Sequence, residues 1–273
     1  VGVVRHGVGD QRAGAPVAVA VLDGDHQRVR GGVGATTIAA NLAVHLADEA
    51  RRHVALVDLN LYTGSTALLL GTRPSAGMRI ALEAPEKVDA LFLDRAGQPV
   101  GERLRVFAAE ESFATAVHPA GNAVAHLIQL LRDRFNHIVI DAPAGFSPLV
   151  RDAFDRVHQR VLVMAPDVAS TRDLARYLAV PNAPAQTSRA VVVLNQAGRP
   201  GALSQKQVEE ALKLAPDVVV LGGGVGLNPA FRRRLLEALS VVPETLRPEV
   251  VAAALGDAAG LVGAAAWATE PDR

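Results

Sequence analysis

The sequence predicts an α/β protein with a doubly wound, mainly parallel sheet and helices on both faces of that sheet. Short β-branched runs alternate with stretches of helical pattern, and this alternation favours a sheet built from crossover units. Several of the runs are apolar nearly throughout, as expected for strands covered on both faces. The crossovers should be right-handed, and ligands then bind beyond the carboxyl ends of the strands.

The individual elements follow from these patterns. The expected strands are Val17–Leu22, Val54–Asp58, Leu104–Ala108, Ile138–Asp141, Val161–Met164, Val191–Leu194 and Val218–Leu221, with a further strand around Val250. The expected helices are Thr37–Asp48, Ala123–Phe135, Ser170–Leu178, Ser204–Leu214 and Asn228–Ser240. The stretch from Gly71 to Gly101 is rich in Pro, Gly and charge, and is expected to be a long surface excursion with one short helix.

Composition limits the possible functions. The chain has 273 residues, of which 49% are apolar, so it can form a sizeable core. Its 28 basic and 28 acidic side chains cancel, which argues against a strong nucleic-acid footprint. Cysteine is absent, which excludes disulfides and thiolate metal sites. No signal peptide is visible, and the apolar run Val250–Ala268 contains Asp257, so a cytoplasmic protein is expected.

A glycine-rich turn, Arg30 to Thr37, opens the first long helical stretch. Glycines let backbone N–H groups face a bound anion, and the helix N-terminus adds partial positive charge. Two later strands end in Asp58 and Asp141, and the second runs into a Pro/Gly turn. Carboxylates at such positions can support a magnesium ion. The three elements together predict a nucleotide-phosphate site with Mg²⁺.

These motifs resemble the deviant Walker A family of MinD and ParA, and most closely its CpaE/TadZ branch of pilus-assembly proteins. The resemblance covers residues 30–213, in the family's order, and implies a P-loop NTPase fold. Its residues are Gly31 to Leu42, Val57-Asp58-Leu59-Asn60, Leu68 to Gly71, Asp141 to Gly145, Pro166 to Asp173 and Leu194-Asn195-Gln196. The excursion after Gly71 also looks like CpaE.

The resemblance implies ATP or ADP with Mg²⁺ as cofactors. The nucleotide-binding residues it implies are Arg30, Gly31, Gly32, Val33, Gly34, Ala35, Thr36, Thr37 and Asn195. Thr36 would be the Mg²⁺ ligand, supported by Asp58 and Asp141. Asn195 would face the adenine base, and Gly145 would lie in the second switch. Two protomers of the family sandwich two nucleotides, so a nucleotide-dependent homodimer is implied.

Three positions depart from the family pattern. The signature lysine that reaches across the dimer is Arg30, which keeps the charge. The lysine that grips the β- and γ-phosphates is Ala35, which cannot do so. The second acid of the first switch is Asn60, which cannot accept a proton. No catalytic residue is assigned, and weak or absent hydrolysis is expected.

The resemblance to CpaE stops near Leu214, which suggests three segments: a leader with one strand (1–29), the P-loop domain (30–213) and an ending (214–273). The ending, with Gly222-Gly223-Gly224 after a strand, resembles the end of ROK-family sugar kinases. It is either a fused piece or an ordinary strand with packing helices. Its helix carries Arg232-Arg233-Arg234, which suits either a surface helix or contact with the inner face of a membrane.

Three functions are compatible with these features. The first is a CpaE/TadZ-like protein that localises the secretion machinery of a type IV (Flp/Tad) pilus and has proteins of that machinery as partners. The second is a MinD/ParA-type ATPase that turns over and positions DNA or the division site. The third, supported only by the ending, is a fragment of a ROK-like sugar kinase.

Overall fold

A computed structural model describes residues 17–23, 32–48, 51–184, 186, 190–197, 201–221 and 249–252. In this part of the chain nine strands form one sheet in the order β3-β4-β2-β5-β1-β6-β7-β8-β9. The strands are β1 (Val17–Asp23), β2 (Val54–Asp58), β3 (Gln98–Val100), β4 (Leu104–Phe107), β5 (His137–Ala142), β6 (Gln159–Met164), β7 (Val191–Leu194), β8 (Val218–Leu221) and β9 (Glu249–Ala252). All pairings are parallel except the edge pair β3–β4.

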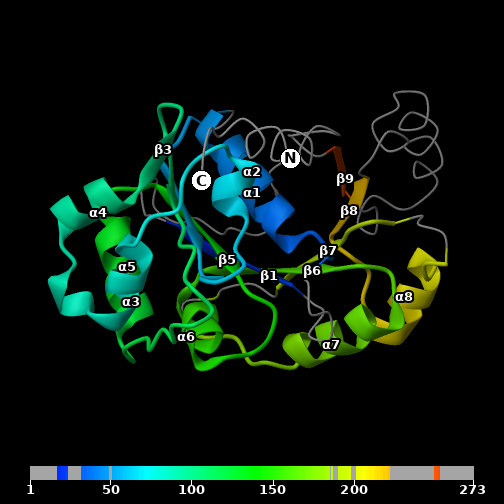
Figure 1. Cartoon of the computed structure of the whole chain (residues 1–273). Helices are drawn as coiled ribbons and strands as arrows, with labels where there is room; N and C mark the ends of the chain where they lie inside the picture. Colours follow the sequence, from blue (N-terminus) through cyan, green and yellow to red (C-terminus); the bar gives the residue numbers. More distant parts are fainter. Residues whose placement is uncertain are drawn as a thin grey trace.

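Helices cover both faces of the sheet (Figure 1). The face that carries α1 (Ala35–Asp48) forms one core cluster, and the opposite face carries α5 (Ala123–Arg132), α6 (Pro148–Arg156) and α7 (Val168–Leu178). Successive residues of β2 alternate between these two cores: Val54 and Leu56 lie in the α1 core, whereas Ala55 and Val57 lie in the other. Every residue of β2 is buried, which explains the apolar run in its sequence.

The predicted fold class is confirmed, and all seven runs expected to be strands form strands. The bounds are as expected for β2, β7 and β8, and a strand is present near Val250, at β9. The helix expected at 228–240 lies outside the described residues, as do residues 24–31, which include the first two residues of the glycine-rich turn.

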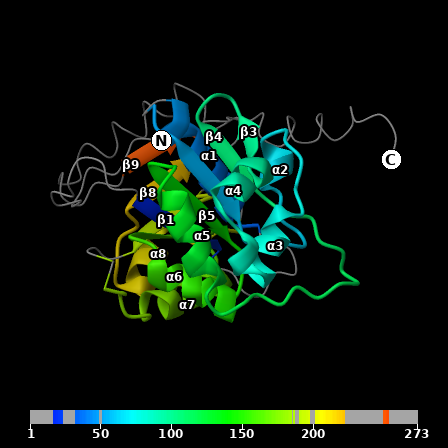
Figure 2. The ribbon, with the colours of Figure 1, turned by 90° about the vertical axis from the view of Figure 1, so that its left-hand side faces the viewer.

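The expectation for Gly71 to Gly101 was wrong. This segment holds α3 (Gly77–Glu83), the 3₁₀ turn η1 (Pro85–Lys87), α4 (Ala90–Ala96) and the edge strand β3. Met78, Leu82 and Leu93 are buried in the main core, so the segment packs against the sheet and is not a surface loop. Figures 1 and 2 place α3 and α4 at the β3–β4 edge of the sheet.

Helix α6 was not expected either. Pro148 at its start reads as a turn residue, but proline fits the first turn of a helix, where its missing N–H is not needed. The hydroxyl of Ser147 accepts a hydrogen bond from Val150 N at 3.3 Å and caps this end. Two short helices complete the described elements, α2 (Thr66–Leu69) and α8 (Gln205–Leu212).

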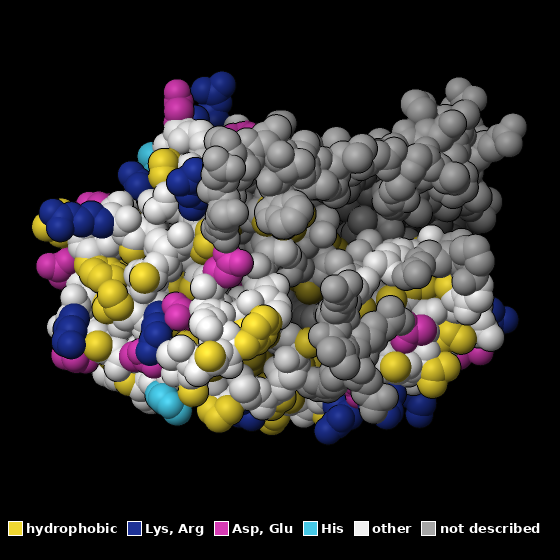
Figure 3. All heavy atoms as spheres, viewed as in Figure 1, with side chains coloured by type: hydrophobic (Ala, Val, Ile, Leu, Met, Phe, Trp, Pro, Cys, Tyr) yellow, Lys and Arg dark blue, Asp and Glu magenta, His cyan; other side chains and the backbone are white. Residues whose placement is uncertain are grey.

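The described surface carries charges of both signs. On the face seen in Figure 3, Lys and Arg are interspersed with Asp and Glu, in keeping with the balanced charge of the sequence. None of the described helices is long and apolar enough to cross a bilayer.

Candidate functional site

The glycine-rich turn leads directly into α1. Gly34 has φ +88°, a backbone conformation that glycine adopts without strain, and α1 begins at the next residue, Ala35. The carbonyl of Gly34 accepts a hydrogen bond from Ile38 N at 3.0 Å and so forms the first turn of the helix. Gly32 is exposed, with φ +154°. Arg30 and Gly31 lie outside the described residues.

The residues on either side of Gly34 show why the turn is fixed in place. Val33 is fully buried, and Ala35 is 5% exposed and lies in the α1 core. Thr36 and Thr37 are half-buried at the start of the helix. The Thr37 carbonyl accepts a 2.7 Å hydrogen bond from Nδ2 of Asn41. The turn is thus anchored by its apolar residues while its threonines stay near the surface.

Asp58 is the last residue of β2 and Asp141 the last but one of β5, so both lie at the carboxyl ends of adjacent strands. They are paired in register between β2 and β5, and both are buried. Burial raises the pKa of Asp58, and hydrogen bonds from Thr66 and Asn60 partly oppose that rise. The two predicted metal-supporting carboxylates are therefore brought side by side.

The loop after β2 is organised around the Asp58 carboxylate. Oδ1 accepts a hydrogen bond from Asn60 N at 2.9 Å, and Oδ2 accepts one from the Thr66 hydroxyl at 2.8 Å. Oδ1 of Asn60 accepts hydrogen bonds from the Thr63 hydroxyl at 3.0 Å and from Thr63 N at 3.3 Å. A Cβ at Gly64 would lie 2.4 Å from Oδ2 of Asp58, so this position requires glycine.

Asn195 lies close to the glycine-rich turn. Its Nδ2 donates a 2.6 Å hydrogen bond to the carbonyl of Val33, and Nε2 of Gln196 donates one of 2.5 Å to the carbonyl of Gly32. A Cβ at Gly34 would lie 2.4 Å from Nδ2 of Asn195. The expected role of Asn195 was contact with adenine; the structure adds a contact with the turn itself. Gln196 was not predicted, although the Asn-Gln pair directly after an apolar strand was visible in the sequence.

The loop after β5 contains Gly145, with φ +101°, followed by Phe146. Phe146 is 39% exposed, and its ring packs edge-on against Phe154 of α6 and Tyr177 of α7, with centroids 5.9 and 5.7 Å away. The expected second switch is therefore attached to two helices by aromatic contacts.

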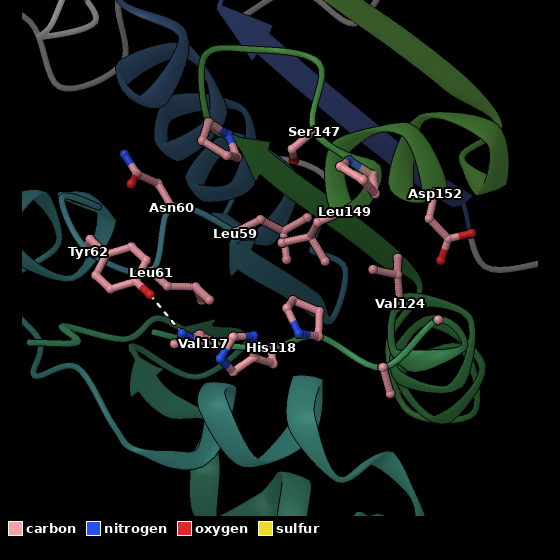
Figure 4. Close-up of a pocket in the computed structure, with 15 residues that line it drawn as sticks. Leu59, Asn60, Leu61, Tyr62, Val117, His118, Val124, Ser147, Leu149 and Asp152 are labelled. Carbon is pink, nitrogen blue, oxygen red and sulfur yellow. Dashed lines mark hydrogen bonds between the residues drawn. The ribbon is translucent and has the colours of Figure 1, made fainter. Parts of the chain in front are cut away.

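A cavity of about 660 Å³ lies behind the two loops that follow Asp58 and Asp141 (Figure 4). Buried Leu59, Leu61 and Val124 contribute to its apolar lining, and Leu149 lines it from α6. His118 comes from the segment that precedes α5. The two loops that follow Asp58 and Asp141 therefore line the same cavity, which was not predicted from the sequence.

The segment 109–121 is fastened to the loop after β2. Glu111 N donates a 2.8 Å hydrogen bond to the carbonyl of Leu61. The Tyr62 hydroxyl accepts one from Val117 N at 2.8 Å, drawn in Figure 4, and donates one to the Thr115 carbonyl at 3.1 Å. The Tyr62 ring stacks on Phe113 with a centroid distance of 6.1 Å.

The same segment is also joined to α3. Arg79 pairs with Glu83 at 2.9 Å and with Glu111 at 3.5 Å. The backbone N–H of His118 donates a 3.0 Å hydrogen bond to Glu83, and this bond lowers the pKa of that carboxyl. Helix α3 is therefore linked, through the segment 109–121, to the loop beside Asp58.

Comparison with proteins of known sequence finds two kinds of relative. The chain is 29% identical over 153 residues to the septum site-determining protein MinD of Synechocystis, which covers 55% of each chain. It is 26% identical over 222 residues to MinD of Helicobacter pylori, with 79% of this chain and 75% of that protein covered. The chain thus spans about half the length of the first of these relatives and three quarters of the second.

The ending has relatives of its own. The ROK family model matches residues 175–271. The bifunctional enzyme NanE/NanK of Brucella melitensis is 46% identical over 50 residues, which cover 18% of this chain and 10% of that enzyme. The expected ROK resemblance is confirmed, and it begins earlier than residue 214. Strands β8 and β9, which lie in this stretch, nevertheless continue the same sheet.

Solved structures with this fold include a ParA family ATPase from Chlorobium tepidum, with a TM-score of 0.67, 19% identity and coverage of 93% of this chain and 99% of that one. A Pyrococcus horikoshii MinD in complex with Mg-ADP has a TM-score of 0.60 and 20% identity, over 93% of this chain and 96% of that one. The fold is that of MinD/ParA P-loop ATPases. The protein is therefore MinD/ParA-like in fold and in sequence, with a ROK-like C-terminal third.

Proposed function

We propose that this protein binds Mg²⁺–ATP or Mg²⁺–ADP at the turn from Arg30 to Thr37 and acts as a MinD/ParA-like protein whose placement in the cell depends on nucleotide. The observation that carries the proposal is the geometry at one edge of the sheet. A glycine turn with φ +88° at Gly34 enters α1, and the carboxylates of Asp58 and Asp141 end neighbouring strands. Backbone N–H groups at a helix N-terminus suit phosphate.

The available side chains fit a hydrated Mg²⁺ held largely by phosphate oxygens. No group of three or more His, Cys, Asp or Glu among the described residues forms a metal cage. Magnesium keeps several waters and needs only one or two protein oxygens when it arrives with a nucleotide. Both Asp58 oxygens already accept hydrogen bonds, so we assign Asp58 to metal-bound water and Thr36 to the ion, with Asp141 beside them.

Nucleotide binding is tested by calorimetry on Gly34→Ala. The added Cβ would lie 2.4 Å from Asn195 and would force a residue with a side chain into φ +88°. We expect ATP affinity to fall at least tenfold. Gly121→Ala is the matched control, because a Cβ there meets nothing within 4 Å and φ is not positive. Equal affinities for Gly34→Ala and Gly121→Ala would refute the site.

The proposed cellular role is that of a CpaE/TadZ-like protein that localises the Flp/Tad pilus machinery with weak or no hydrolysis. Ala35 and Asn60, which replace a lysine and an acid of the resembled family, support this choice. The competing role is a turning-over ATPase for septum placement, favoured by the MinD relatives. Deleting the gene separates the two: loss of surface pili with normal division supports the first, and minicells or filaments support the second.

We also propose that ATP stabilises a homodimer. If each nucleotide contacts both chains, ATP binds the dimer better than the monomer and shifts the equilibrium toward it. The guanidinium of Arg30 has the planar fork that suits phosphate oxygens across such an interface. Sedimentation with and without Mg²⁺–ATP measures the shift. Arg30→Ala should reduce dimer formation more than it reduces nucleotide affinity of the monomer.

A sugar-kinase activity of the ROK-like part is the third hypothesis, supported by the match over residues 175–271. It predicts ADP release that depends on an added sugar. Release that is the same with and without a panel of hexoses and amino sugars would remove this hypothesis. We propose that residues 30–213 form the nucleotide-binding domain, preceded by a leader with one strand (1–29) and followed by the segment 214–273.

A further inference from the structure

The structure assigns Asn195 and Gln196 as positioning residues that hold the phosphate-binding turn open for its anion. This inference rests on the proposed nucleotide site and adds a second role to a residue placed, by resemblance, against the base. The two side-chain amides donate hydrogen bonds of 2.6 and 2.5 Å to the carbonyls of Val33 and Gly32. The partners are 162 and 164 residues apart in the chain, so the contact joins two separate loops.

The direction of these bonds explains what they do. In a trans peptide unit the carbonyl and the following N–H point to opposite sides. Fixing the Gly32 and Val33 carbonyls toward the loop after β7 therefore turns the N–H groups of Val33 and Gly34 to the other side. N–H groups facing outward from a glycine turn are the ones that bind phosphate. The two amides set the orientation that the anion needs before it arrives.

The two hydrogen bonds from Asn195 and Gln196 act as a clamp on the turn, and the loop that carries these side chains is fixed in place. The backbone N–H of Asn195 donates a 2.8 Å hydrogen bond to the carbonyl of Met164 at the end of β6, and this bond anchors the loop to the sheet. Gln196 has φ +58°, a left-handed conformation that costs a residue with a side chain free energy. Gly34 approaches Asn195 so closely that a Cβ does not fit. The left-handed conformation of Gln196 and the close approach of Gly34 to Asn195 both bring the loop after β7 into contact with the turn.

An asparagine amide has enough hydrogen-bonding groups for two tasks. Its nitrogen carries two hydrogens and its oxygen accepts, so one N–H can hold Val33 while the rest of the amide faces a base. The loop after β7 thereby connects recognition of the base to the shape of the phosphate turn. If Asn195 contacted only the base, its substitution would not change the affinity of a ligand that lacks a base.

The experiment compares ATP with inorganic tripolyphosphate, which has the phosphates but no base. Asn195→Ala is expected to weaken both ligands by about three- to tenfold, the usual effect of one lost hydrogen bond. Gln196→Ala should weaken both by a similar factor. Asn195→Asp places a carboxylate against the Val33 carbonyl and should weaken tripolyphosphate at least as much. Asn122→Ala, an exposed asparagine whose side chain makes no cap hydrogen bond, is the control.

Loss of ATP affinity in Asn195→Ala with unchanged tripolyphosphate affinity would overturn the inference, because it is the result of base reading alone. A second measurement needs no ligand. Hydrogen exchange at the amide of Ile38, which is bonded to the Gly34 carbonyl, should be several-fold faster in Asn195→Ala than in wild type, and equal rates would also overturn it. If wild type binds neither ligand, the proposed function fails, and the exchange rates still decide whether the clamp exists.

Discussion

The hydroxyl of Thr66 donates a 2.8 Å hydrogen bond to Oδ2 of Asp58, and neither residue is exposed to solvent. This bond ties the end of β2 to the start of α2 and closes the loop between them. Thr66 N lies 3.3 Å from the same oxygen, and Asn60 N bonds the other oxygen. A buried carboxylate is thus stabilised by donors from its own loop, so the loop conformation and the charge of Asp58 depend on each other.

The first prediction concerns Thr66→Val, which keeps the shape of the side chain and removes its hydroxyl. Hydrogen bonds to charged groups contribute about 1.5–3 kcal/mol, so we expect a loss of unfolding free energy of that order near neutral pH. Thr63→Val removes an exposed hydroxyl that bonds Asn60 and should cost less than half as much. Equal losses in urea unfolding for the two variants would contradict the importance of the Asp58 contact.

The second prediction concerns Asn60→Asp. Oδ1 of Asn60 accepts hydrogen bonds from Thr63, and aspartate keeps that acceptor. The variant should therefore fold normally while it gains a carboxylate that can orient water. We expect ATP hydrolysis to rise, measured as phosphate release at saturating ATP. Asn60→Ser, which cannot supply a carboxylate, should leave the rate at the wild-type level.

A wild-type rate that already matches active MinD or ParA proteins would remove the premise of this prediction.

Ala35→Lys has a different expected outcome. Ala35 is 5% exposed and lies in the α1 core, so lysine should lower stability unless its ammonium group reaches a bound phosphate. Added ATP should then recover more stability in Ala35→Lys than in wild type.

Much of the central sheet was predictable because its strands are uninterrupted apolar runs with sharp limits. The bounds of Val54–Asp58 and Val191–Leu194 agree with the structure for this reason. The stretch Gly77–Glu83 was misread because its Pro- and Gly-rich context favours a loop locally, whereas burial of Met78 and Leu82 stabilises a helix. Such burial depends on the position of the sheet edge, which the local sequence does not contain.

The candidate site, like the fold, was only partly predictable from the sequence. The glycine turn, Asp58 and Asp141 were predictable from the motif and from strand ends. The bond between Asn195 and Val33 was not, because it joins residues that are distant in sequence and depends on how two loops meet. The link from Tyr62 to Thr115 and Val117 was also hidden, since a single tyrosine in a loop gives no signal about its partners.

The third prediction tests that link. Tyr62→Phe keeps the ring stacked on Phe113 but leaves Val117 N without its acceptor. We expect a loss of about 1–2 kcal/mol in unfolding free energy, the cost of unsatisfied polar groups. Faster hydrogen exchange should be confined to Val117 and Glu111, whose amides bond the Tyr62 loop. Phe113→Ala removes a ring that is 81% exposed and should have a smaller effect.

The fourth prediction concerns pH and His137, at the start of β5. Burial, with a smaller contribution from the positive charge of Arg52, lowers the pKa of His137 below its ordinary value of 6.5. Its Nδ1 is buried without a hydrogen-bond partner. The neutral ring is therefore favoured in the folded protein, whereas the unfolded chain takes up a proton at about pH 6.5.

The sign of the effect follows from this difference. Above pH 6.5 the ring is neutral in both states and the stability is fully present. As pH falls from 6.5 through the lowered pKa of the folded state, the unfolded chain binds more protons and the unfolding free energy decreases. The slope should be a fraction of about 1.4 kcal/mol per pH unit, because the side chain is only partly buried and solvent screens Arg52. His137→Phe should remove this part of the slope between pH 6.5 and 5. Unfolding free energies are obtained from urea unfolding at each pH. If those of variant and wild type change equally over that range, His137 is protonated equally in the folded and unfolded states.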